Sequence, residues 1–143
     1  MSNEKIIIDE LKLQPGDSIV IPKSGLNIVQ HYALYLGFDE HYNYYMSENV
    51  VGIGVKLTRV QDFFKQETRI SQIEKFEGSK EQRTQIVQTA LAKLGLPYSL
   101  INYNCEHFVS DVKTGKAKSR QLEKAAIFIG IILLIAFFAR KNN

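Results

Sequence analysis

A long apolar run lies close to the C-terminal end of this chain. Residues 125–139 (AAIFIGIILLIAFFA) carry no polar side chain, and they lie between Lys124 and Arg140. Ten of them are Ile, Leu or Phe, which together favour insertion into a bilayer by about 3 to 6 kcal/mol. As a helix the run covers ~22 Å of a ~30 Å hydrocarbon core, and snorkelling of the flanking cations or local thinning makes up the difference. We therefore predict a single membrane-spanning C-terminal anchor over residues 125–140.

The two alternatives for this segment are a buried core helix and an amphipathic helix lying in the membrane plane. Both would need a polar face, which the run lacks. Residues 114–124 before it form a basic juxtamembrane linker, and the positive-inside rule places the preceding domain on the cytoplasmic side. The linker also favours anionic lipid by about 1 kcal/mol per charge. The start of the chain is too charged, and its apolar run too short, for a signal peptide.

The remaining residues contain enough apolar material for one compact domain. Of the 143 residues, 45% are hydrophobic and 23% are charged, which is typical of a globular protein. Residues 1–111 carry 11 basic and 14 acidic side chains, a net charge of −3, so the domain lacks the basic footprint of a nucleic-acid-binding protein. One cysteine excludes an internal disulfide, and three histidines make a structural zinc site hard to build. We expect no metal, no cofactor and no nucleic-acid partner.

Hydrophobic periodicity and turn residues predict a mixed α+β domain. Short apolar or alternating segments, separated by turn residues, predict strands over residues 18–21, 28–37, 44–50, 55–57 and 70–76. In the second of these, alternation places His31, Ala33 and Tyr35 on one face and Tyr32, Leu34 and Leu36 on the other. Between the last two strands, residues 58–65 predict a short helix capped at Thr58.

Two further helices have clear start and stop signals. Ser79 begins a capping-box pattern ahead of an apolar stripe, and Gly95 is a suitable end for that helix. Asn104 can cap a last helix over residues 105–113, with Gly115 at its end.

Cys105 is the first residue of that last helix. Unpaired backbone N–H groups and the positive end of the helix dipole favour a thiolate there, so the position suits a nucleophile. Cys105 shares a side of the helix with Phe108, Val109 and Val112, so its sulfur points into the domain. The alternative, a small buried apolar side chain without chemistry, stays open.

A thiolate nucleophile needs a base within about 3 Å, and the three histidines differ in their eligibility. His107 lies two residues beyond Cys105 and about 200° round the helix, so it cannot reach the sulfur, and we expect it at the surface or behind the site. His41 lies in a polar hairpin loop and is expected to be solvated. His31 is the sensible partner because it lies in the clearest strand, and a hydrogen-bonded core histidine is the alternative.

A third side chain should orient the imidazole of the base. Glu48 and Asn49, on the strand after the hairpin, and His41 in the loop are the candidates. The residues alone do not choose among these three.

Three motifs, in this order, resemble a known family. They are PGD at residues 15–17, HYALYLG at residues 31–37 and NCEHFV at residues 104–109. Over roughly residues 11–113 the chain resembles the lecithin:retinol acyltransferase family, which includes H-rev-type phospholipases and phospholipid N-acyltransferases. The resemblance implies a circularly permuted papain-like α+β domain, in which a small antiparallel sheet carries the histidine and a helix N-terminus carries the cysteine.

The same resemblance implies residue roles and a reaction. Cys105 becomes the nucleophile and His31 the general base, while the family's third residue, often a second histidine, is matched most closely by Glu48. The implied function is a membrane-tethered cysteine acyltransferase or phospholipase, acting on phospholipid or other acyl-lipid esters through a thioester. Two alternatives stay open: a cysteine peptidase or amidase of the permuted papain-like class, and a non-catalytic membrane-anchored binding module.

Overall fold

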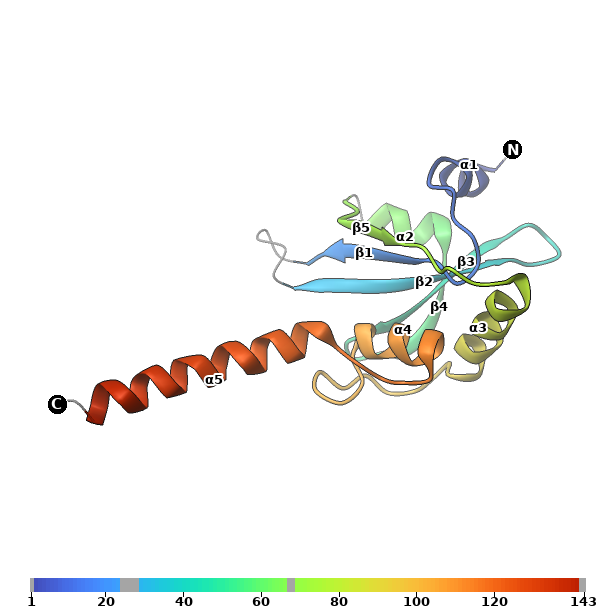
Figure 1. Cartoon of the computed structure of the whole chain (residues 1–143). Coiled ribbons are helices and arrows are strands. Elements are labelled where there is room, and N and C mark those ends of the chain that lie inside the picture. Colours follow the sequence, from blue (N-terminus) through green and yellow to red (C-terminus); the bar gives the residue numbers. More distant parts are fainter. Residues whose placement is uncertain (1, 24–28, 67–68, 142–143) are drawn as a thin grey trace.

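The computed structural model describes residues 2–23, 29–66 and 69–141, and over these it forms an α+β domain from which one helix projects (Figure 1). Five antiparallel strands make one sheet in the order β4-β3-β2-β1-β5. The strands are β1 (Ser18–Pro22), β2 (Gln30–Phe38), β3 (Tyr44–Val50), β4 (Gly54–Arg59) and β5 (Gln72–Glu74). The helices are α1 (Asn3–Glu10), α2 (Val60–Gln66), α3 (Lys80–Ala92), α4 (Cys105–Thr114) and α5 (Arg120–Lys141). A small antiparallel sheet packed against helices is the architecture predicted from the sequence.

Both faces of the sheet are covered, because β2 alternates between two apolar sets. Tyr32, Leu34 and Leu36 pack with residues of α3 and α4, whereas Ala33 and Tyr35 pack with residues of α1 and α2. Figure 1 accordingly shows α1 and α2 on one side of the sheet and α3 and α4 on the other. The two faces predicted from alternation are confirmed, and β2 is the central strand.

One boundary differs from the prediction at Thr58. β4 continues to Arg59 and α2 starts at Val60, so Thr58 does not cap the helix. It pairs instead with Met46 in β3, and its hydroxyl group donates to Glu48 at 2.6 Å. The predicted cap is wrong because the strand pairing uses this threonine inside the sheet.

Two further differences concern the start of β2 and the presence of the helix α1. The strand predicted over residues 28–37 begins at Gln30, and its first predicted residue lies outside the described part of the chain. The helix α1 was not predicted; Ser2 caps it, and Glu4 forms a 2.8 Å ion pair with Arg59. A helix this short is stabilised by such tertiary contacts more than by its own propensity.

The helix α4 begins at Cys105, as predicted, because Asn104 caps it. The side-chain oxygen of Asn104 accepts hydrogen bonds from the backbone N–H groups of Glu106 and His107, both at 3.0 Å. His107 Nδ1 in turn accepts from the backbone N–H of Asn104 at 3.2 Å. His107 is therefore a buried capping residue and does not lie at the surface. Gly115, with a φ of 71°, ends the helix as predicted.

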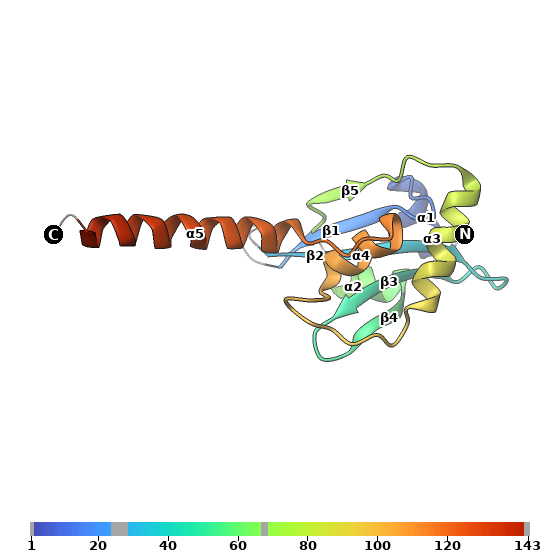
Figure 2. The same cartoon turned by 60° about the horizontal axis from the view of Figure 1, so that its bottom comes forward.

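The C-terminal helix α5 points away from the domain in both views (Figures 1 and 2). Residues Arg120–Arg140 contain a segment with a mean hydropathy of 2.3, and none of that segment is buried inside the protein. By length and composition this helix could cross a membrane.

Candidate active site

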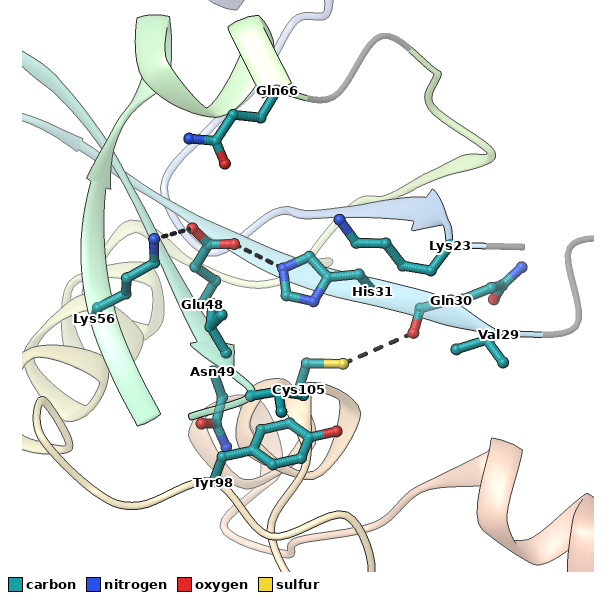
Figure 3. A pocket seen from close by; sticks show the side chains of 12 residues that line it. Lys23, Val29, Gln30, His31, Glu48, Asn49, Lys56, Gln66, Tyr98 and Cys105 are labelled. Carbon is teal, nitrogen blue, oxygen red and sulfur yellow. Dashed lines mark hydrogen bonds and ion pairs between the residues drawn. The ribbon is translucent and has the colours of Figure 1, made fainter. Parts of the chain in front are cut away.

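A cavity of about 350 Å³ lies where β2, β3 and the start of α4 meet. Figure 3 shows its lining, which includes His31 from β2, Glu48 from β3 and Cys105 from the first turn of α4. Tyr98, in the loop before α4, also lines it. The structure thus brings into one cavity three site residues that the sequence analysis drew from separate segments.

The register of the strands explains why Glu48 meets His31. Ala33 of β2 pairs with Glu48 of β3, and His31 lies two residues before Ala33 on the same face of β2. The two side chains are therefore diagonal neighbours across the sheet. His31 Nε2 and Glu48 Oε2 are 2.7 Å apart.

The other two candidates for the third position have other bonding partners, although Asn49 also lines the cavity. Asn49 follows Glu48 and so points to the opposite face of β3, where its amide group donates to the backbone oxygen of Tyr103 at 2.7 Å. His41 stands on the exposed β2–β3 hairpin, with its Nδ1 3.9 Å from a carboxylate oxygen of Glu40. Of the three candidates, Glu48 is the one in contact with His31.

Two residues that hold Glu48 were missed by the sequence analysis. Lys56 pairs directly with Glu48 in the β3–β4 register, and its ammonium nitrogen is 3.3 Å from Glu48 Oε1. Thr58, two residues further along β4, donates to the same oxygen at 2.6 Å. The alternation of β4 would have placed both on the face of Glu48, but only once the register was known.

Burial and nearby charges have opposite effects on the pKa of His31, and also on the pKa of Glu48. Burial lowers the pKa of His31, but its hydrogen bonds and Coulombic interactions with Cys105 and Glu48 outweigh this effect and raise the pKa to about 9. Burial raises the pKa of Glu48, but His31, Thr58 and Lys56 outweigh it and lower this pKa to about 2. Near neutral pH the pair is therefore an imidazolium beside a carboxylate.

Cys105 faces both the cavity and the central strand. The residue is 8% exposed, and its thiol donates a weak hydrogen bond to the backbone oxygen of Gln30, with Sγ 3.7 Å from that oxygen. Figure 3 shows that the ring nitrogen of His31 not bonded to Glu48 lies on the side of the ring that faces Cys105. The first turn of α4 therefore places the thiol of Cys105 on one side of the His31 ring, and Glu48 contacts the ring through its other nitrogen.

The same backbone oxygen connects the cavity to α5. Gln121, in the first turn of α5, donates to the oxygen of Gln30 at 3.2 Å and accepts from the N–H of Gln30 at 2.8 Å. Glu106, next to Cys105, accepts hydrogen bonds from Ser119 Oγ at 2.9 Å and from the backbone N–H of Gln121 at 3.1 Å. The first turn of α5 is thus bound to the two elements that carry the thiol and the histidine, and no local sequence pattern signals this link.

Among residues 2–23, 29–66 and 69–141, no group of three or more His, Cys, Asp or Glu side chains is arranged to hold a metal ion. What the cavity offers is a thiol, an imidazole and a carboxylate, the groups that a nucleophilic triad requires.

The chain is similar to one known family and to a human protein. The family model described as lecithin retinol acyltransferase matches residues 11–118, which is most of the chain. The human protein named phospholipase A and acyltransferase 4 is 38% identical over 48 residues, which cover 32% of this chain and 29% of that protein. The matched segment thus spans less than a third of this curated relative.

Proposed function

The chain belongs to the lecithin retinol acyltransferase family, and on that premise we propose that it is a membrane-tethered enzyme acting on the acyl esters of lipids through a thioester on Cys105. The observation that carries the proposal is the single cavity lined by Cys105, His31 and Glu48, with His31 and Glu48 2.7 Å apart. Within this proposal residues 11–113 are the catalytic domain, residues 114–124 the juxtamembrane linker and residues 125–140 the anchor.

The reaction has two steps. In the reactive state the thiol proton of Cys105 lies on His31, which the raised pKa of His31 favours, and the thiolate attacks the carbonyl carbon of the ester, so that an S–C bond forms and the negative charge moves to the carbonyl oxygen. That oxyanion collapses, the C–O bond to the alcohol breaks, and the His31 imidazolium gives its proton to the leaving oxygen. The enzyme then holds the acyl group as a thioester.

The second step releases the acyl group. Water, or an amine or alcohol acceptor, attacks the thioester while His31 accepts its proton, and the thiol of Cys105 is regenerated. Glu48 stabilises the imidazolium in both steps, which fits the raised pKa of His31, about 9, and the lowered pKa of Glu48, about 2. Lys56 and Thr58 keep the carboxylate in place through its other oxygen.

A phospholipid is the favoured acyl donor. The matched human protein is named as a phospholipase A and acyltransferase, and α5 by its composition is suited to hold the cavity close to a bilayer. Tethering raises the effective concentration of acyl chains at the site. The excess of basic residues ahead of the apolar run supports a cytoplasmic position for the domain.

The order of the site residues supports a permuted papain-like topology. In papain-like proteases the nucleophilic cysteine lies near the N-terminus and the histidine follows it in the chain. Here the sheet residue His31 comes first, and Cys105 opens a helix later in the chain. The same contact between a helix N-terminus and a strand is then reached with the two elements in the opposite order.

The test is an intact-mass measurement on the full chain reconstituted in phosphatidylcholine vesicles. We expect a covalent acyl adduct on the wild-type chain, and none on Cys105→Ser or His31→Gln. His41→Gln is the matched control, because His41 is exposed on the hairpin, and this variant should acylate like wild type.

Two other results would point to the alternatives. Acylation of Cys105 by a peptide thioester or amide, with no reaction on phospholipid, would favour a peptidase or amidase. A thiol that reacts with iodoacetamide no faster than a free cysteine, with no acyl adduct from any donor, would favour a non-catalytic module.

A further inference from the structure

Two turns beside the cavity expose large aliphatic side chains. The β3–β4 turn carries Val51 and Ile53, which are 71% and 63% exposed, and Val51 lines the cavity itself. The loop before α4 carries Leu100 and Ile101, which are 65% and 71% exposed. We call these four residues the apolar rim. Clustered exposed aliphatic residues of this kind mark an interaction surface, whereas single ones do not.

The rim is held in place by backbone hydrogen bonds, so its exposure is built into the fold. Ser99 and Tyr103 exchange two hydrogen bonds, at 3.0 and 2.9 Å, which close a small hairpin with Leu100 and Ile101 at its tip. Asn49, at the end of β3, donates to the backbone oxygen of Tyr103 and ties this hairpin to the sheet beside the cavity.

Both turns project on the side of the domain from which α5 leaves (Figures 1 and 2). The first turn of α5 is fixed there by Gln121, which exchanges hydrogen bonds with Gln30 at the edge of the cavity. Rim, cavity and helix therefore share one end of the molecule. The exposed aromatic pair Phe38 and Tyr42 lies on the β2–β3 hairpin, at the other end of the sheet.

The length of α5 fixes how close that end comes to a bilayer. From Lys124 to Arg140 the helix covers ~25 Å, less than the ~30 Å thickness of the hydrocarbon core. Gln121 lies three residues before Lys124, about 4.5 Å along the helix axis. The headgroup region adds about 5 to 8 Å on each side of the core. A spanning α5 therefore draws its first turn, and the cavity edge bonded to it, into the headgroup region.

We propose that the apolar rim inserts into the lipid headgroup region around the cavity and forms the membrane-docking surface through which an acyl chain reaches Cys105. This deepens the proposed function and rests on it for the identity of the ligand. A bilayer is favoured over a protein partner because the apolar rim lies at the end of the molecule from which the apolar helix α5 leaves, and because the basic residues Lys116, Lys118 and Lys124 directly precede the apolar segment in the chain.

The chain contains no tryptophan, so a single introduced tryptophan reports on one position. The experiment uses the full chain with Cys105→Ser, which prevents lipid turnover, in vesicles containing phosphatidylcholine brominated close to the headgroup. Ile101→Trp is the probe, and Tyr42→Trp on the distant hairpin, where Tyr42 is 66% exposed, is the matched control. We expect bromine to quench Ile101→Trp strongly and its emission to lie at shorter wavelength than that of Tyr42→Trp.

Equal quenching at the two positions would overturn the proposal. A short-wavelength emission of Ile101→Trp without bromine quenching would also overturn it, because the rim would then be covered by protein, such as a second copy of the chain. Because the probe chain cannot form a thioester, this readout is independent of whether the wild-type chain becomes acylated.

A second variant tests the consequence for turnover. Leu100→Ser with Ile101→Ser should lower acylation by vesicles by about tenfold, since both apolar contacts with lipid are lost. Acylation by a soluble short-chain ester should change less than about twofold. An equal loss on both substrates would indicate damage to the site itself and would contradict a docking role.

Discussion

Glu48 is the residue that joins the charged groups of the cavity to one another. Its carboxylate meets the imidazolium of His31 through one oxygen, and Lys56 and Thr58 through the other. These four side chains come from three adjacent strands and lie on one face of the sheet. A carboxylate satisfied in this way can stay ionised although it is buried, because charged partners and hydrogen bonds offset the loss of water.

The coupling of His31 and Glu48 predicts a window of pH in which the pair stabilises the fold. The pKa of His31 is raised from 6.5 to about 9, so its contribution is complete below pH 6.5 and is lost as the pH rises through 9. The pKa of Glu48 is lowered from 4.5 to about 2, so its contribution is complete above pH 4.5 and is lost as the pH falls through 2. The free energy of unfolding of wild type should exceed that of Glu48→Gln most between pH 4.5 and 6.5.

This difference is measured by urea unfolding of the detergent-solubilised full chain across the pH range. The matched control is Glu40→Gln, which alters the exposed contact of Glu40 with His41 and should leave the pH dependence unchanged. A difference between wild type and Glu48→Gln that stays constant from pH 5 to 10 would contradict the coupling.

At the scale of elements, the start of α4 is built around Asn104. The Asn104 side chain caps two backbone N–H groups of α4, and its amide group donates to the backbone oxygen of Leu100 at 3.1 Å. One residue therefore holds both the helix that begins with Cys105 and the hairpin that carries half of the apolar rim.

Asn104→Ala should lower the free energy of unfolding by about 1 to 2 kcal/mol, the upper range for the loss of an N-cap. Ser79→Ala, which removes the exposed cap of α3, is the comparison and should cost about 0.5 to 1 kcal/mol. Urea unfolding measures both. A larger loss for Ser79→Ala would mean that Asn104 does not have this central role.

The link between α4 and α5 rests on the buried carboxylate of Glu106. Hydrogen bonds from Ser119, Arg120 and Gln121 lower the pKa of Glu106 against the effect of burial, so it remains an anion at the start of α5. Because Glu106 follows Cys105 in α4, the same residue helps to fix both the orientation of α5 and the position of the thiol.

Glu106→Gln keeps the size of this side chain but removes its charge. We expect amide hydrogen exchange at Gln121 to accelerate by about tenfold, because its N–H loses a charged acceptor, and exchange at Leu122 to follow, because its N–H donates to Ser119 Oγ, which Glu106 holds in place. Glu123→Gln, an exposed change in the same first turns of α5, should leave these rates within about twofold. Unchanged exchange in Glu106→Gln would show that α5 is held by other contacts.

At the scale of the whole molecule, the domain and the apolar part of α5 are energetically separate. The two core clusters of the described residues contain no residue of α5, and the apolar segment is exposed in the structure. A change in that segment should therefore alter membrane association without altering the stability of the domain.

Ile131→Lys with Leu134→Lys should abolish stable membrane insertion. The two charges cost about 5 to 7 kcal/mol at the centre of a spanning helix, which matches or exceeds the ~3 to 6 kcal/mol that the apolar residues supply. We expect this variant to be extracted from membranes by alkaline carbonate, with an unchanged unfolding midpoint. The control Ile131→Leu with Leu134→Ile should stay in the membrane fraction, and retention of the lysine variant would contradict a spanning α5.

The local sequence was sufficient to predict much of this arrangement. Alternation in residues 28–37 predicted the two faces of the central strand, and Asn104 and Gly115 predicted the limits of α4. The apolar run of α5 needed no tertiary information either. These features depend on residues within a few positions of one another, so the sequence contains their physical cause directly.

The contacts between distant side chains could not be predicted from the sequence and follow from the way the strands and helices pack. The pairing of β2 with β3 selected Glu48 over Asn49 and His41 as the neighbour of His31, across 17 positions in the chain. The bonds between Gln30 and Gln121 join residues 91 positions apart. Such contacts follow from strand register and helix packing, in which a shift of one residue turns every side chain to the other face, and no local pattern encodes that choice.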